Sequence, residues 1–151
     1  MKKIFLLFVL FSGAAFGQFT VSNNDWKEVG KYFEGIKLYE NLDKTKAKIY
    51  YLDYNTIGNS VSTIDLSKSY EFIFSTEKDT LDKLHKLIIE KLQEKKKQEL
   101  ILNFQEGNLF LDFYAANFVS FKFENKASNE DLKRTTVGLN INRVNKLFGK
   151  K

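Results

Sequence analysis

Few side chains in this sequence can do acid–base or metal chemistry. His85 is the only histidine, and cysteine is absent. A structural or catalytic zinc site needs several further ligands at coordinating spacings, and a catalytic base needs a nucleophile or acid beside it. Neither arrangement is present around His85, which borders the apolar stripe of an expected helix. We therefore predict an ordinary helix-interface role for His85, and neither a metal nor a cofactor.

Two aspartates are the remaining candidates for chemistry. Asp53 lies within the run "YYLDY", and Asp112 lies within "LFLDFY". Strand alternation places Asp112 on the same face as Phe110 and Tyr114. If that face is covered, the acid has an unusual environment, and a carboxylate-based hydrolase becomes an alternative. If the face is open to solvent, Asp112 is a surface residue, which is the simpler interpretation.

The tyrosines suggest binding rather than catalysis. Tyr39, Tyr51 and Tyr114 could form a platform for a sugar or a protein surface, where tyrosine is enriched. The competing interpretation is that aromatic residues fill the core of a sheet, which they also favour. The predicted ligand- or partner-binding residues are therefore Tyr39, Tyr51, Asp53, Asp112 and Tyr114.

Several classes of function lack their sequence signals. Phosphate-binding loops, the G-x-S-x-G elbow, H-E-x-x-H and EF-hand patterns are all missing. The balance of 24 basic against 19 acidic residues is mild. Only two of the basic residues are arginines. The run of three lysines at 95–97 suits the C-terminal end of a helix. We therefore expect no nucleic-acid partner.

The N-terminus has the layout of a secretory signal peptide. Two lysines precede the apolar run Ile4–Phe11, and the small residues Ala15 and Gly17, three and one positions before the cut, make a cleavage site before Gln18. As a helix, even the longer stretch from Ile4 to Phe16 would cover about 20 Å, against about 30 Å for a bilayer core. A short uncleaved anchor and a buried N-terminal element are the alternatives. We predict that residues 1–17 are removed.

Export follows from that prediction. The expected location is the periplasm or the exterior of a Gram-negative bacterium, with no membrane insertion after cleavage. Because the chain has no cysteine, it has no lipid-bearing residue at the cut and no disulfide. The core alone must hold the exported chain together.

Residues 18–151 are predicted to form a single α+β domain. The segment 24–35 has helical spacing with a capping box, and 80–97 carries an apolar stripe that predicts one long helix. The end of the chain fits a helix at 141–148 or a strand at 136–142. Strands are expected at 36–40, 48–54, 70–75, 99–104, 109–114 and 117–125. The order α-βββ-α-βββ-α implies one antiparallel sheet of five or six strands packed against the long helix.

The resulting hypothesis is a small exported, non-enzymatic binding module, for example an inhibitor- or immunity-type protein. The first alternative is a carrier of a small apolar ligand in a cavity between sheet and helix. A dry cavity above about 300 Å³ would favour the carrier, whereas a filled core with exposed tyrosines would favour the binding module. The second alternative is a hydrolase that uses Asp53 or Asp112.

The first testable prediction concerns the leader. Protein recovered from the cell envelope should begin at Gln18, because the residues before it are removed on export. Intact-mass measurement and N-terminal sequencing check this. A recovered chain that still begins at Met1 would contradict both the cleavage and the location inferred from it.

Overall fold

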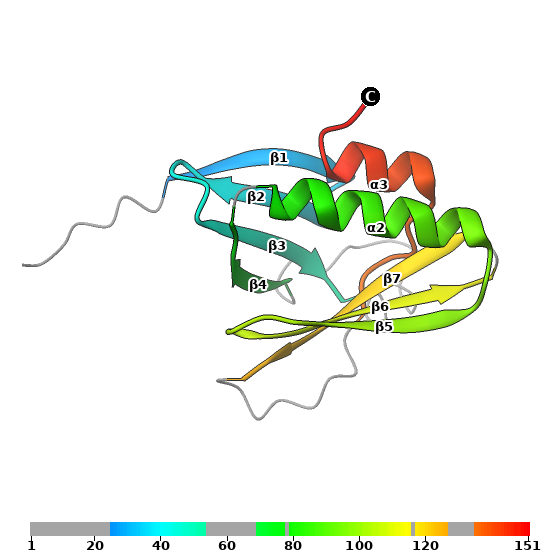
Figure 1. Cartoon of the computed structure of the whole chain (residues 1–151). Coiled ribbons are helices and arrows are strands. Elements are labelled where there is room, and N and C mark those ends of the chain that lie inside the picture. The colour runs from blue at the N-terminus through cyan, green and yellow to red at the C-terminus, as the bar shows by residue number, and fades with distance from the viewer. Residues whose placement is uncertain (1–24, 54–68, 78, 116, 127–134) are drawn as a thin grey trace, which may run out of the picture.

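A computed structural model of the chain describes residues 25–53, 69–77, 79–115, 117–126 and 135–151. The predicted signal peptide, residues 1–17, lies outside this part of the chain. The described residues form two antiparallel sheets and two helices (Figure 1).

The first sheet has four strands, which pair in the order in which they occur along the chain. They are β1 (Trp26–Tyr32), β2 (Ile36–Asn41), β3 (Lys46–Leu52) and β4 (Ser69–Ser75). Helix α2 (Thr80–Glu94) then leads to the second sheet of three strands, followed by helix α3 (Ile141–Leu147). The strands of the second sheet are β5 (Gln98–Asn103), β6 (Gly107–Tyr114) and β7 (Phe118–Asn125).

The predicted fold, one sheet of five or six strands on one long helix, is wrong. The structure has separate sheets of four and three strands, and its described helices are short, with 15 and 7 residues. The element order is ββββ-α-βββ-α rather than α-βββ-α-βββ-α. Helix α2 connects β4 to β5 in the chain, and these two strands lie in different sheets and do not pair, so the strands form two sheets rather than one.

In place of the helix predicted at 24–35, the described residues of this segment form strand β1 and the turn that follows it. Its register against β2 shifts between Glu28 and Gly30, so that Val29 is an extra residue in the strand. Such a bulge interrupts the two-residue alternation of a strand. The apolar residues of β1 therefore have an irregular spacing, and in the sequence this spacing resembles a helical period.

Aromatic contacts join the two sheets across one core. Phe72 and Phe74 of β4 are buried, and the Phe72 ring lies 5.0 Å from the ring of Phe123 on β7. Phe104, directly after β5, lies 4.7 Å from the Phe74 ring. The space between the sheets is thus filled by side chains.

Both helices cover this core on the same side. Figure 1 shows α2 and α3 next to each other, with the first sheet to the left and the second sheet below right. Helix α2 buries Leu84, Ile88 and Leu92, and α3 buries Val144 and Leu147. The alternatives left open for the end of the chain are also resolved: Leu139 makes a single bridge to Val119, and the helix begins at Ile141.

The end of α3 lies directly against the bulge of β1. A Cβ atom on Gly30 would sit 2.2 Å from the backbone oxygen of Lys146 and 2.7 Å from that of Leu147. Gly149, with a φ of +64°, ends this helix next to the Val29 carbonyl. Only a residue without a side chain fits at Gly30, because backbone atoms occupy the space.

Gly30→Ala tests whether this segment is a strand or a helix. In a helix, the substitution would stabilise the protein by up to about 1 kcal/mol. In the observed structure, the added methyl group forces α3 away from β1, so we expect the free energy of unfolding to fall by about 1–3 kcal/mol. Urea denaturation measures it. Lys31→Ala, a change to an exposed residue of the same strand, should stay within about 0.5 kcal/mol.

Candidate functional site

The outward side of the first sheet carries aromatic residues at positions where a solvent-facing strand usually has polar ones. Tyr39 on β2 lies opposite Lys48 on β3, and Lys37 lies opposite Tyr50. On the far side of β3, Lys48 pairs with Ile73 of β4. We call the outward-facing set the aromatic face: Trp26, Lys37, Tyr39, Lys48, Tyr50 and Ile73.

Lys48 organises this face. Its ammonium nitrogen lies 5.0 Å from the ring centroid of Trp26 and 5.2 Å from that of Tyr39. The same Nζ is 3.1 Å from a carboxylate oxygen of Glu71 on β4. The side chain of Lys48 is only 15% exposed. Through these cation–π contacts, Lys48 on β3 joins one ring from β1 to one ring from β2.

Lys37 makes a similar contact beside it. Its Nζ lies 5.7 Å from the Tyr50 ring centroid, and it also pairs with Glu34 in the turn after β1. Lys37 donates a hydrogen bond to the Glu34 carboxylate, and this bond raises the pKa of Lys37 and lowers the pKa of Glu34. Both groups are therefore charged at neutral pH, and Lys37 stays fixed over its ring.

The five residues predicted for binding do not come together. Tyr39 lies on the aromatic face. Tyr51 points into the core, is 4% exposed and contacts the Phe123 ring at 4.7 Å. Asp53 is also buried, and one of its oxygens accepts a hydrogen bond from the Thr135 backbone N–H at 3.4 Å.

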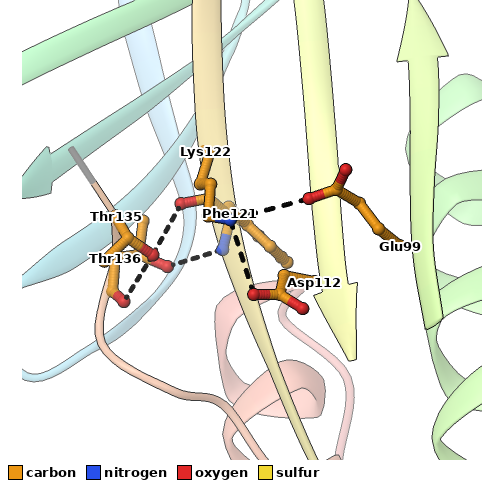
Figure 2. A network of polar contacts seen from close by, with 6 residues as sticks. All are labelled: Glu99, Asp112, Phe121, Lys122, Thr135 and Thr136. Carbon is orange, nitrogen blue, oxygen red and sulfur yellow. Dashed lines mark hydrogen bonds and ion pairs between the residues drawn. The ribbon is translucent and has the colours of Figure 1, made fainter. Parts of the chain in front are cut away.

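The other two predicted residues, Asp112 and Tyr114, lie on the outward side of the second sheet. Figure 2 shows Lys122 between two acids, with its Nζ 3.5 Å from Asp112 Oδ2 and 3.5 Å from Glu99 Oε2. The Asp112 side chain is 36% exposed. It is thus one of two carboxylates that share a lysine on an open sheet face.

Figure 2 also shows the contacts that cover the outer edge of β7, the edge that does not pair with β6. The hydroxyl of Thr136 accepts a hydrogen bond from the Phe121 N–H at 3.0 Å, and the Thr136 N–H donates to the Phe121 carbonyl at 3.0 Å. The Thr135 hydroxyl lies 3.5 Å from the same carbonyl oxygen. These contacts hold the segment before α3 beside β7, and they add no reactive group to the lysine and its two acids.

Sequence reasoning missed most of the aromatic face. Trp26 was assigned to a helix, so its position beside Lys48 could not be inferred. Tyr50 is not among the predicted binding residues. The alternation of β2 and β3 could have placed Tyr39, Lys48 and Tyr50 on one side, because two expected strands joined by a short connection form an antiparallel pair.

A pocket of about 660 Å³ lies at one end of the molecule, between the turn after β2, the start of α2 and the end of the chain. Its charged lining consists of five carboxylates and two lysines: Glu40, Asp43, Glu77, Asp79, Asp82, Lys44 and Lys150. A neighbouring pocket of about 400 Å³ shares Val29, Glu40, Lys44 and Phe148 with it. Neither pocket is the apolar cavity between sheet and helix that a carrier would need.

The groups considered for catalysis are dispersed. Neither Asp53 nor Asp112 lines these two pockets. The Nε2 atom of His85 is 2.8 Å from Asn145 Oδ1, and its ring packs on Phe148, which confirms the helix-interface role. Among the described residues, no group of three or more His, Cys, Asp or Glu side chains is arranged to hold a metal ion.

Comparison of the chain with protein-family models, with curated proteins and with solved structures finds no match. None of the helices in the described part of the chain has the length and apolar character required to cross a bilayer.

The pocket supplies a prediction about ionisation. Lys150 Nζ lies 2.6 Å from Asp82 Oδ1, and this hydrogen bond and charge lower the pKa of Asp82. The ion pair therefore stabilises the folded state at pH values above the ordinary pKa of an aspartate. This stabilisation is lost as the pH falls through the lowered pKa of Asp82. Lys150→Met should return the Asp82 pKa toward its ordinary value, as measured by NMR titration of the carboxyl carbon.

Lys151→Met is the matched control, since it removes a neighbouring charge without touching the pair. The change in stability should be small in both variants, because an exposed ion pair contributes about 0–1 kcal/mol. An unaltered Asp82 titration in Lys150→Met would show that the lysine is not its partner.

Proposed function

We propose that this chain is a small exported binding protein, without an enzymatic activity of its own, that holds a protein partner on the aromatic face. The single observation that carries the proposal is the placement of Trp26, Tyr39 and Tyr50 on the outward side of the first sheet. An inhibitor- or immunity-type protein is the form of binding protein that this proposal envisages. The export part rests on the sequence of residues 1–17.

The composition of the face supports a protein partner. Tryptophan and tyrosine are enriched among the residues that dominate protein–protein binding energies, because they bury a large area and keep a polar tip. Ile73, beside Lys48, is 40% exposed and gives the face an apolar contact point. Lysines and glutamates around these residues supply a polar rim of the kind that surrounds many interfaces.

Rigidity supports the same conclusion. The aromatic face spans all four strands of a hydrogen-bonded sheet, and Lys48 fixes two of its rings. Side chains that are already ordered lose little conformational entropy when a partner binds. A face of this kind can bind without first rearranging, so a modest contact area is sufficient for useful affinity.

The two alternatives lack comparable support. The space between the sheets is filled by rings, such as those of Phe72 and Phe123, and both described pockets have charged linings. The carboxylates proposed for hydrolysis lie apart, with Asp53 buried and Asp112 paired with Lys122. No observation therefore favours a carrier or a hydrolase over a binding protein.

The test uses two matched isoleucines. Ile73 and Ile101 each lie on the outward side of an edge strand, and they are 40% and 51% exposed, but only Ile73 belongs to the aromatic face. The full-length protein with a C-terminal tag is produced in its native host and purified from the envelope, and bound proteins are identified by mass spectrometry. Ile73→Asp should reduce recovery of the partner at least about tenfold, since it buries a charge in the interface.

Ile101→Asp should leave recovery of the same partner unchanged. Tyr50→Ala provides a second variant of the aromatic face, and thermal melting verifies that each variant is folded. Equal recovery with Ile73→Asp, Tyr50→Ala and the unmodified protein would overturn the assignment of the aromatic face as the binding surface.

A further inference from the structure

Arg143, in the first turn of α3, is held between two aromatic rings from different sheets. Its guanidinium carbon lies 4.6 Å from the ring centroid of Tyr32, at the end of β1, and 5.7 Å from that of Phe118, at the start of β7. The side chain of Asn140 accepts a hydrogen bond from the Arg143 backbone N–H at 3.0 Å and fixes the start of the helix. The guanidinium therefore has an aromatic ring of each sheet close to it.

The stack continues to the surface at both ends. The Phe33 ring meets the Tyr32 ring edge-on at 4.9 Å, and the Tyr114 ring is stacked on the Phe118 ring at 6.2 Å. Phe33 and Tyr114 are 41% and 39% exposed. We call this row of four rings and one guanidinium, Phe33–Tyr32–Arg143–Phe118–Tyr114, the arginine row. It contains none of the residues of the aromatic face.

The guanidinium keeps unused hydrogen-bond donors. Arg143 donates from Nη1 to the Gly138 carbonyl oxygen at 3.0 Å. Within the described ranges, no carboxylate forms an ion pair with it. A guanidinium has five N–H donors, all in its own plane. Among the described residues, the donors other than the one on Nη1 that meets Gly138 make no hydrogen bond, and they lie in the plane of the group.

The contacts with the two rings hold α3 against both sheets, and they leave donors of Arg143 without a protein partner among the described residues. A planar guanidinium with such donors matches a carboxylate, which can accept two parallel hydrogen bonds from it.

We propose that the arginine row binds a carboxylate group of an acidic peptide segment in a partner protein. The carboxylate pairs with the in-plane donors of Arg143, and apolar parts of the segment contact the exposed rings of Phe33 and Tyr114. The row contains one positive charge, which matches the single negative charge of a carboxylate better than the higher charge of a phosphate. Because the row is separate from the aromatic face, this inference stands or falls independently of the proposed function.

The two arginines of the sequence make a direct test possible. The ¹⁵N-labelled protein has two arginine Nε–H signals, from Arg134 and Arg143, and Arg143→Lys assigns them by loss of one. The probe is an acetylated and amidated hexapeptide in which tyrosine and glutamate alternate. Its titration should shift the Arg143 signal to saturation. The same peptide with glutamine in place of glutamate should bind about tenfold more weakly or worse, because the charged hydrogen bonds are lost.

Two variants complete the design. Arg143→Lys keeps the charge but loses the planar fork, so peptide binding, followed through backbone amide signals of β7, should weaken by about tenfold. Lys146→Gln removes a charge one turn further along the same helix and should leave binding unchanged. If Arg143→Lys does not fold, the comparison of glutamate and glutamine peptides on the unmodified protein still decides the matter.

Three results would overturn the proposal: equal binding of the glutamate and glutamine peptides, an Arg143 signal that does not move with the glutamate peptide, or tighter binding of inorganic phosphate than of that peptide. The last result would show that the row recognises a phosphate group instead of a carboxylate.

Discussion

The contact between phenylalanine rings from the two sheets is the interaction on which the rest of the structure depends. In the described part of the chain, no strand of one sheet pairs with a strand of the other, and the sequence has no cysteine that could link them. Their relation is set by Phe72 and Phe74 against Phe104 and Phe123, with the two helices above. Burying each such ring contributes about 1.5–3 kcal/mol, so a few of them can define how the sheets meet.

This packing decides which residues are left for recognition. In β3, alternate residues turn toward the rings of the core or away from them, so Tyr51 is buried while its neighbour Tyr50 faces outward. The outward residues of the first sheet form the aromatic face. The arginine row forms where the end of β1 and the start of β7 meet the start of α3, and this meeting exists only because both sheets share one core.

Much of the local structure could be read from the sequence. Alternation and turn residues locate six of the strands, β2 to β7, and the apolar stripe locates α2. Pairing between distant segments could not be read in this way, because the sequence does not show that α2 divides the strands into two sheets. The bulge at Val29 concealed β1, and with it the position of Trp26 beside Lys48. Of the five predicted binding residues, Tyr39 alone could be placed on the aromatic face, since the contacts of the others depend on long-range packing.

The same bulge has a consequence for how the molecule behaves among other chains. β1 is an outermost strand of the first sheet, and an outermost strand with regularly spaced backbone groups is a template for aggregation. The extra residue at Val29 breaks that spacing, and the end of α3 lies against the irregular stretch. A foreign strand cannot continue its hydrogen-bond ladder along the whole of β1, so this border of the sheet resists uncontrolled self-assembly.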